Sequence, residues 1–204
     1  MSTWVKVCGL RTTRDVAVAV EAGADAVGLM LAPSPRRISI TEAAELVEAA
    51  GPLQTVLVMV DISVEDADRA IQATGATGLQ VYGAHGQEVA RWGTERGLFV
   101  LQPFAIGSES VSAVSVAPGA TPLFDTVLPD AYGGGGRIFD WKLVRGYLGR
   151  FVLAGGLNPD NVGSAVRETG AWGVDASSGL ESSRGIKDHA KIRAFIEGAK
   201  QHEA

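Results

Sequence analysis

The sequence predicts an α/β fold, a single-domain (β/α)8 barrel of the TIM-barrel type. Short apolar runs typical of strands alternate with segments of helical periodicity along the whole chain, and eight such units can be counted. No linker or change of composition interrupts the 204 residues, so we expect one domain, residues 1–204. Glycine-bearing turns follow the last two strands, where such barrels usually bind phosphate. An open, doubly wound sheet is the alternative, because alternation alone does not establish closure.

The expected elements follow in order along the chain. Strands are expected at Trp4–Cys8, Ala26–Leu31, Thr55–Val60, Gly78–Tyr82, Leu98–Phe104, Pro122–Thr126, Phe151–Ala154 and Gly173–Asp175. Helices are expected at Thr13–Ala22, Thr41–Ala50, Val64–Thr74, Glu88–Arg96, Asn158–Thr169 and Lys187–Lys200. Thr41, followed by two acids, predicts a helix N-cap. The fifth unit is the least regular, because Gly107–Ala117 fits either a loose helix or a loop.

The composition restricts the possible partners and location of the protein. A hydrophobic content of 46% with 20% charged residues and 26 glycines is typical of a turn-rich globular protein. No apolar run reaches the ~18 residues of a membrane span, and the first residues show no signal-peptide pattern, so we expect a cytoplasmic protein without membrane contact. A net charge of −5 argues against a nucleic-acid partner. One cysteine and three histidines, in no ligand-like spacing, predict no metal site.

The two glycine-bearing turns near the C-terminal end suit an anion. Glycine allows backbone N–H groups to approach an anion closely, and a following helix start adds its dipole and unpaired donors. One Gly-Gly pair after a strand is usually only a tight turn, whereas two turns in register with the last two units of a barrel are much stronger evidence. The sequence therefore predicts that phosphate is bound by Gly155, Gly156, Ser177, Ser178 and Gly179.

Reactive groups in a barrel stand at the C-terminal ends of the strands. This rule selects Cys8, Arg36, Gln80, Tyr82, Asp125 and Asp175. Cys8 and Asp125 would meet at the barrel mouth, where a thiol and a carboxyl can act as base and acid. Alternatively, Cys8 is a small buried hydrophobic residue and Asp125 caps a turn.

Two loops add further candidates. Arg36 follows a proline after the second strand, and its guanidinium could hold a carboxylate through two hydrogen bonds. Alternatively it is a solvated surface arginine, which is what we expect of its neighbour Arg37. The run Gly133–Gly136 is either a flexible lid near the phosphate or a surface loop.

Seven segments in this order and spacing resemble the phosphoribosylanthranilate isomerase family over essentially the whole chain. They are Lys6-Val7-Cys8-Gly9, Ser34-Pro35-Arg36, Gln80-Val81-Tyr82-Gly83, Phe124-Asp125, Gly133-Gly134 through Phe139-Asp140-Trp141, Leu153-Ala154-Gly155-Gly156-Leu157-Asn158-Pro159, and Ser177-Ser178-Gly179 through Gly185-Ile186-Lys187-Asp188. The family usually has His where this chain has Tyr82, a hydroxyl residue at Gly135, and Val at Ala176. These departures leave the acid, the base and the arginine in place.

The resemblance implies an Amadori rearrangement of N-(5-phosphoribosyl)anthranilate in tryptophan biosynthesis, without a cofactor, on a small phosphosugar substrate. Asp125 would be the general acid that opens the ribose ring, and Cys8 the base that removes the C2′ proton. Arg36 would hold the anthranilate carboxylate, and Gln80 and Tyr82 would line the substrate site. These roles require a raised pKa for Asp125 and a thiol pKa shifted toward thiolate for Cys8. A monomer or homodimer is expected.

Two other functions remain open from the sequence. A histidine-pathway isomerase of a similar aminoaldose phosphate pairs two aspartates, and the thiol of Cys8 argues against it. A phosphosugar-binding protein without catalysis would keep the phosphate turns and lose the chemistry. The presence of Cys8 together with Asp125 disfavours that alternative, and an activity assay distinguishes the two.

Overall fold

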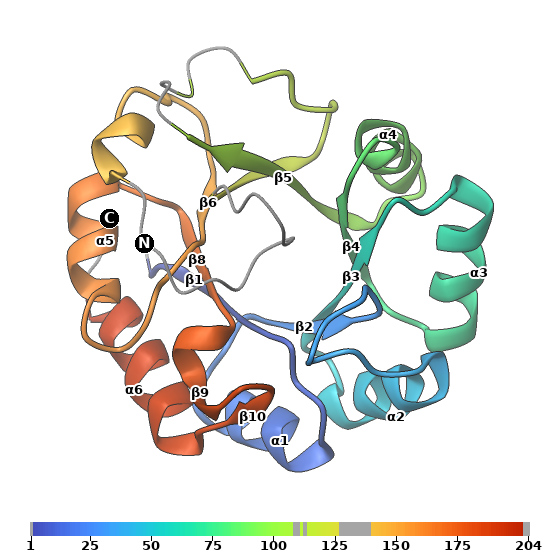
Figure 1. Ribbon diagram of the computed structural model, residues 1–204, viewed down its shortest axis with the longest axis horizontal. Helices are drawn as coiled ribbons and strands as arrows, with labels where there is room; N and C mark the ends of the chain where they lie inside the picture. The colour runs from blue at the N-terminus through green and yellow to red at the C-terminus, as the bar shows by residue number, and fades with distance from the viewer. Residues whose placement is uncertain (1, 108–110, 112–113, 127–139, 202–204) are drawn as a thin grey trace.

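A closed barrel of eight parallel strands forms the centre of the protein in the computed structural model, which describes residues 2–107, 111, 114–126 and 140–201. The strands pair in chain order, and the last pairs with the first, so the predicted barrel is confirmed and the open sheet is excluded (Figure 1). They are β1 (Trp4–Cys8), β2 (Ala26–Met30), β3 (Gln54–Val60), β4 (Gly78–Tyr82), β5 (Phe99–Ile106), β6 (Thr121–Thr126), β7 (Val152–Leu153) and β8 (Gly173–Ala176).

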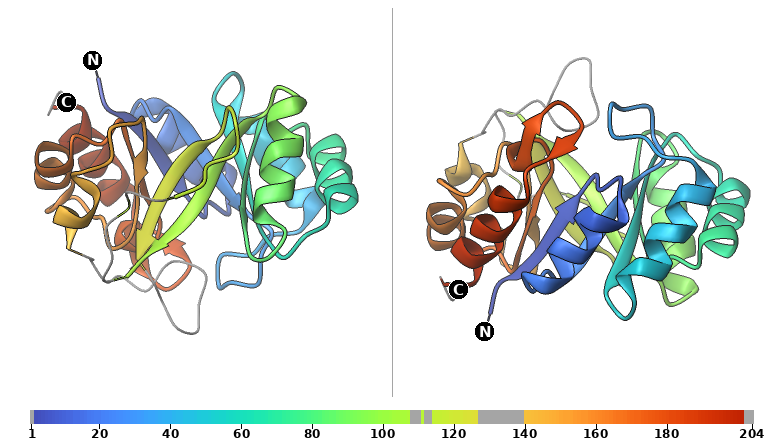
Figure 2. Two further views of the ribbon diagram at one scale, coloured as in Figure 1. Left: turned by 90° about the horizontal axis from the view of Figure 1, so that it is seen from above. Right: turned by 90° about the horizontal axis from the view of Figure 1, so that it is seen from below.

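Helices cover the outside of the barrel, as the two side views in Figure 2 show. They are α1 (Thr13–Glu21), α2 (Ile40–Ala50), α3 (Val64–Thr74), α4 (Gly86–Glu95), α5 (Val162–Thr169) and α6 (His189–Lys200). The described residues between β5 and β6 form no α-helix, and a short 3-10 helix, η2 (Trp141–Val144), precedes β7. No helix in these described ranges is long and apolar enough to cross a membrane.

The start of α2 corrects one prediction from the sequence. The N-cap is Ser39, whose hydroxyl accepts a hydrogen bond from the backbone N–H of Glu42 at 3.2 Å. The carboxylate of Glu42 in turn accepts from the backbone N–H of Ser39 at 2.7 Å. The prediction of a cap at Thr41 was wrong, because this reciprocal capping box needs the acid three residues after the cap.

Two other helices, α5 and α6, begin later than predicted. The side chain of Asn158 accepts hydrogen bonds from the N–H groups of Asp160 and Asn161, which forms a turn and delays α5 to Val162. Lys187 belongs to β10 (Ile186–Lys187), which pairs antiparallel with β9 (Glu181–Ser183). Asp188 then caps α6 by accepting from two N–H groups of its first turn.

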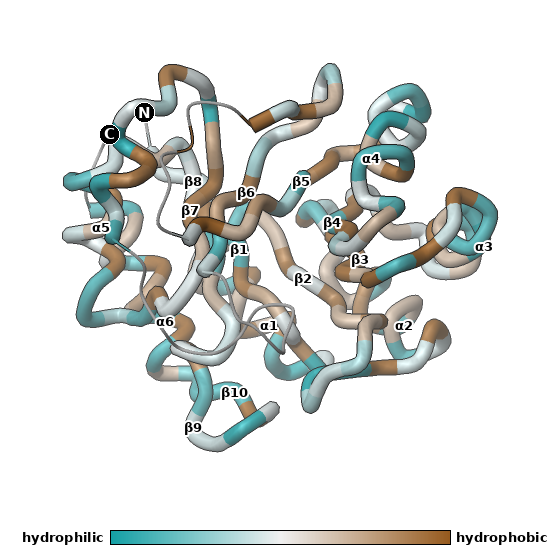
Figure 3. The backbone as a smooth tube through the Cα atoms, turned by 45° about the horizontal axis from the view of Figure 1, so that its top comes forward, coloured by the Kyte–Doolittle hydropathy of each residue, from teal (hydrophilic) through white to brown (hydrophobic). Residues whose placement is uncertain are grey.

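Strand alternation decides which side chains enter the barrel. Val5 and Val7 face the helices and pack in the main hydrophobic core, whereas Lys6 and Cys8 lie on the opposite face of β1. In Figure 3 the strands are mostly brown or white, while teal segments gather on the helices and loops. A polar residue such as Lys6, which is fully buried within this apolar frame, must therefore find its partners inside the barrel.

Candidate active site

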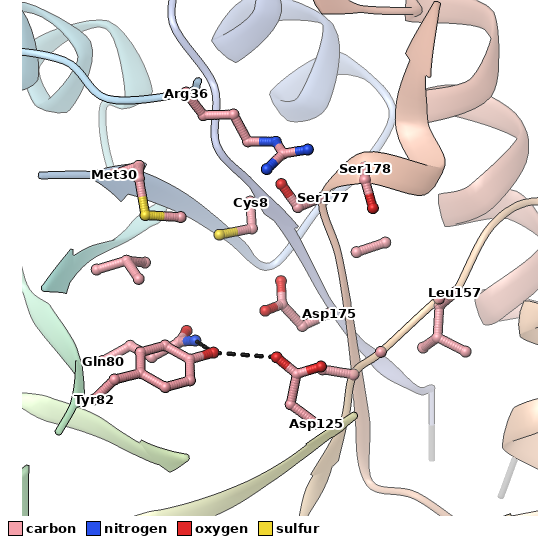
Figure 4. Close-up of a pocket in the computed structure, with 15 residues that line it drawn as sticks. Cys8, Met30, Arg36, Gln80, Tyr82, Asp125, Leu157, Asp175, Ser177 and Ser178 are labelled. Atoms are coloured by element: carbon pink, nitrogen blue, oxygen red, sulfur yellow. Dashed lines mark hydrogen bonds between the residues drawn. The ribbon is translucent and has the colours of Figure 1, made fainter. Parts of the chain in front are cut away.

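A cavity opens at the C-terminal ends of the strands. It brings together most of the residues selected from the sequence, as the close-up in Figure 4 shows. The predicted site residues that line it are Cys8, Arg36, Gln80, Tyr82, Asp125, Gly155, Gly156, Ser177 and Ser178. Gly179 does not line this cavity. The predicted run Gly133–Gly136, with the departure at Gly135, lies outside the described residues.

Cys8 ends β1 with its side chain in the cavity and is 4% exposed. Its neighbour on β2 is Gly28, where an added Cβ would lie 2.6 Å from the sulfur of Cys8. Such a distance is far inside van der Waals contact, so only glycine at position 28 leaves room for the thiol.

The protonation of Cys8 differs from what its proposed role led us to expect. Burial in the barrel raises the pKa of the Cys8 thiol, and the nearby ammonium of Lys6 offsets this only in part. Asp175 adds to the rise because its charge repels a thiolate. The expectation of a thiol shifted toward thiolate was therefore wrong for the ligand-free protein, in which Cys8 is neutral at physiological pH.

Asp125 is the penultimate residue of β6 and is 8% exposed. Desolvation raises the pKa of its carboxyl to about 6, as its proposed role requires. Two hydrogen bonds limit the rise, because both stabilise the carboxylate. The backbone N–H of Thr126 donates to Oδ1 at 2.8 Å, and the hydroxyl of Tyr82 donates to Oδ2 at 3.2 Å.

A chain of hydrogen bonds crosses the floor of the cavity. The ammonium of Lys6 donates to Asp175 Oδ2 at 2.7 Å and to Gln80 Oε1 at 2.9 Å. Gln80 Nε2 donates to the hydroxyl of Tyr82 at 2.8 Å, and that hydroxyl donates to Asp125. Tyr82, where the family usually has His, thus connects Gln80 to Asp125. Lys6 was not among the site residues selected from the sequence. A lysine between two valines of a buried strand nevertheless indicates a buried charge that needs a partner.

Arg36 is 6% exposed and held by a buried acid, so it is not a surface arginine; Arg37 beside it is exposed, as expected. Its Nε and Nη2 donate to Glu181 at 2.5 and 3.0 Å, a bidentate pair. Nη1 makes no hydrogen bond with the described residues. The guanidinium is thereby fixed with one edge left for a ligand. Glu181 was missed, because it lies far from Arg36 in sequence.

Lys187 completes this cluster. Its ammonium donates to Glu181 Oε1 at 3.2 Å and to the carbonyl oxygen of Ser177 at 2.8 Å. Burial lowers the pKa of Lys187, and the charge of Glu181 opposes that change. Lys187 therefore ties the turn after β8 to the same acid that positions Arg36.

The two glycine-bearing turns lie against each other and against β6. Gly155 and Gly156 have φ of +85° and +68°, which favours glycine. A Cβ on Gly155 would lie 2.8 Å from the backbone N of Thr126 and 3.1 Å from Asp125 Oδ1, so glycine allows this turn to approach the carboxyl. A Cβ on Gly179 would lie 2.0 Å from the carbonyl oxygen of Leu157. Gly179 thus allows close contact between the two turns.

Comparisons with known proteins identify the family to which the chain is similar. A family model described as N-(5'phosphoribosyl)anthranilate (PRA) isomerase matches residues 5–198. An N-(5'-phosphoribosyl)anthranilate isomerase from Myxococcus xanthus is 42% identical over 210 residues, which cover 98% of this chain and 97% of the relative. The phosphoribosyl anthranilate isomerase structure from Thermotoga maritima is 33% identical with a TM-score of 0.85, and the match covers 98% of this chain and 99% of that one.

A further solved structure was determined with a ligand. It is a phosphoribosyl anthranilate isomerase in complex with reduced 1-(o-carboxyphenylamino)-1-deoxyribulose 5-phosphate, 30% identical with a TM-score of 0.81. The match covers 98% of this chain and 99% of that chain. The family model spans nearly all of the barrel, and the relative matches almost from end to end. This chain belongs to the N-(5'-phosphoribosyl)anthranilate isomerase family.

Proposed function

We propose that the protein catalyses the Amadori rearrangement of N-(5-phosphoribosyl)anthranilate to 1-(2-carboxyphenylamino)-1-deoxyribulose 5-phosphate in tryptophan biosynthesis. The observation that carries the proposal is the placement of Cys8 and Asp125 in one cavity, with Arg36 on one side and the glycine-bearing turns on another. A thiol and a carboxyl of this kind can move the two protons that the reaction needs. No step calls for a cofactor.

Asp125 begins the reaction as the acid. Its protonated carboxyl donates a proton to the ring oxygen of the ribose, the C1′–O bond breaks, and the nitrogen lone pair forms a cationic Schiff base at C1′. With a pKa of about 6, a far larger fraction of this carboxyl is protonated at neutral pH than of an exposed aspartate, whose pKa is about 3.9. More of the enzyme therefore carries the proton that the acid must donate. Burial of the side chain is thus the physical source of its reactivity.

Cys8 continues as the base. Its thiolate removes the proton from C2′, the C1′–C2′ double bond forms, and the nitrogen regains its lone pair as an enolamine. The enol then loses its hydroxyl proton while C1′ gains one, which yields the ketone. The cationic Schiff base next to Cys8 favours the thiolate, because an adjacent positive charge lowers a thiol pKa. Lys6 supplies a second positive charge from below.

The active form has one proton on the pair, placed on Asp125 rather than on Cys8. Because the Cys8 thiol has the higher pKa, this arrangement is the minority one among singly protonated states. Between the two pKa values, the fraction of the enzyme in this active form does not change with pH. The dependence of kcat/KM on pH is therefore a bell that falls below about pH 6, where both groups are protonated, and above the raised pKa of Cys8, where both are ionised.

Arg36→Ala is expected to raise KM about tenfold or more with a smaller effect on kcat. Charged hydrogen bonds from the guanidinium to the anthranilate carboxylate would be lost, while Glu181 keeps its contact with Lys187. Steady-state kinetics measure the split. Arg37→Ala is the matched control, because Arg37 is exposed beside it and should leave both constants unchanged. Equal effects of the two variants would contradict the assignment of Arg36.

Ser178→Asp is expected to abolish protection by inorganic phosphate against thermal unfolding. A ligand that binds only the folded state raises the melting temperature, and the wild type should show this rise with increasing phosphate. Ser178 lines the cavity at the turn after β8, so a carboxylate there repels the anion without changing a glycine. Ser182→Asp, at an exposed position of β9, is the control and should keep the protection. Equal protection of Ser178→Asp and wild type would place the phosphate elsewhere.

The function itself is tested by following the loss of substrate fluorescence with purified protein. Turnover by the wild type that falls about 10²-fold or more in Cys8→Ser supports the isomerase. No turnover, combined with tight binding of the substrate, would favour a phosphosugar-binding protein without catalysis. Turnover of the histidine-pathway aminoaldose phosphate in its place would identify the other isomerase.

We also propose a cytoplasmic location and a monomer or homodimer. A solved relative of this family is described as monomers generated from a dimeric enzyme of Thermotoga maritima, which supports both states as options within the family. Light scattering of the purified protein gives the state of this chain.

A further inference from the structure

One oxygen of the buried carboxylate Asp175 has no partner. Asp175 stands on β8 directly opposite Lys6 in the barrel register and is 6% exposed. Its Oδ2 accepts a hydrogen bond from the Lys6 ammonium at 2.7 Å, whereas Oδ1 is buried and makes no hydrogen bond with the described part of the chain. Leaving a buried charged acceptor unpaired is energetically unfavourable. Such a group indicates a ligand that supplies the missing donor.

Asp175 lines the same cavity as the acid and the base. Its charge raises the pKa of both Cys8 and Asp125, so it lies close to each of them (Figure 4). Lys6 holds the other oxygen in place and is itself fixed by Gln80. The side chain is therefore oriented before any ligand arrives. None of the steps derived above for the rearrangement uses it.

Resting on the proposed function, we propose that Asp175 Oδ1 accepts a hydrogen bond from the 2′-hydroxyl of the phosphoribosyl group. An ionised carboxylate only accepts hydrogen bonds, so its partner must be a donor. The donors of this substrate are the sugar hydroxyls and the amine N–H, since its carboxylate and phosphate are acceptors. Cys8 must lie beside C2′ to remove its proton, and the hydroxyl on that carbon is the donor that reaches the neighbouring carboxylate.

This contact distinguishes the substrate from the product. The substrate and the enolamine both carry a hydroxyl at C2′, whereas the product carries a ketone there, which has no proton to donate. A ketone oxygen next to Asp175 Oδ1 places two acceptors together, and this arrangement is unfavourable in a buried site. Asp175 therefore holds the hydroxyl through the proton transfers and weakens the binding of the ketone, which promotes product release.

The test compares two ligands by isothermal titration calorimetry. The first is the product, and the second is its reduced form, in which a 2-hydroxyl replaces the ketone. Wild type and Asp175→Asn are titrated with both. Asparagine keeps an oxygen for Lys6 and places an NH2 donor where Oδ1 stood, so it can donate to a ketone. The preference for the reduced ligand over the product should fall about tenfold or more in Asp175→Asn.

A ratio of the two dissociation constants removes general effects of the substitution, since a loosened site weakens both ligands alike. Asp66→Asn, at an exposed position of α3, is the control and should keep the wild-type ratio. An Asp175→Asn ratio within twofold of wild type overturns the inference. If wild type binds neither ligand, the proposed function fails instead, so the two failures are distinguishable.

A crystal structure of the wild type with the reduced ligand tests the contact without any substitution. This test remains valid even if Asp175→Asn fails to fold. The 2-hydroxyl oxygen should lie within about 3.2 Å of Asp175 Oδ1, the range of a hydrogen bond. A hydroxyl turned toward another residue, with Oδ1 bound by water, overturns the inference.

Discussion

Replacing Asp125 with asparagine is expected to lower kcat/KM about 10³-fold while stabilising the folded protein at neutral pH. The amide cannot protonate the ribose ring oxygen, and the loss of a positioned general acid typically costs 10²- to 10⁴-fold. The fluorescence assay gives the rate. Asparagine is close to aspartate in shape and keeps an oxygen for the N–H of Thr126, so the loss reports chemistry rather than a collapsed site.

The stability gain follows from the raised pKa. A pKa of about 6 in the folded protein, against about 3.9 in an unfolded chain, means that the unfolded state ionises first as pH rises. Asp125 therefore lowers stability progressively between about pH 4 and pH 6, and the loss persists above pH 6. It amounts to about 1–3 kcal/mol, at 1.36 kcal/mol for each pKa unit. Asparagine has no charge to bury, so the Asp125→Asn variant does not lose this stability.

Urea unfolding at pH 7.5 and pH 4 measures this effect. Asp125→Asn should be more stable than wild type at pH 7.5, and the difference should shrink at pH 4. Glu95→Gln, which changes an exposed acid at the end of α4, should show no such change. A difference that is equal at both pH values would mean that the carboxyl of Asp125 is not buried as a charge.

Cys8→Ser is expected to reduce turnover by about 10²-fold or more. A hydroxyl keeps much of the shape of the thiol, yet its pKa lies far above neutrality, so almost no base is present. The effect should fall on kcat, because the Arg36 and phosphate contacts remain. Binding of the reduced product, measured by calorimetry, should stay within a few-fold of wild type. Wild-type kcat in Cys8→Ser would show that another group removes the C2′ proton.

The pH profile separates the two groups. In wild type the acid limb near pH 6 belongs to Asp125 and the alkaline limb to Cys8. The residual activity of Asp125→Asn should lack the limb near pH 6, because the amide does not titrate. A limb that persists at the same pH in this variant would assign it to a different group.

Much of the fold could be predicted because the alternation of strands and helices follows from the pattern of apolar residues within each segment. The helix predicted at Val64–Thr74 has the same bounds in the structure, where Ser63 caps its start and Gly75 ends it in a left-handed conformation. The starts of α2 and α6 were misplaced, because Ser39 and Asp188 compete with neighbouring polar residues for the cap position. Such competition is settled by hydrogen-bond geometry that a sequence pattern does not contain.

The sequence by itself determined the eight alternating units, and with them the prediction that Cys8, Asp125 and Arg36 lie at the mouth of a barrel, because strand ends in a parallel barrel share one rim. Only the tertiary structure decided how these groups are charged and held. The raised pKa values of Cys8 and Asp125 come from burial by residues distant in the chain. The partners Lys6–Asp175 and Arg36–Glu181 join segments separated by more than a hundred residues. Desolvation and pairing depend on distances in space, and those exist only once the barrel has closed.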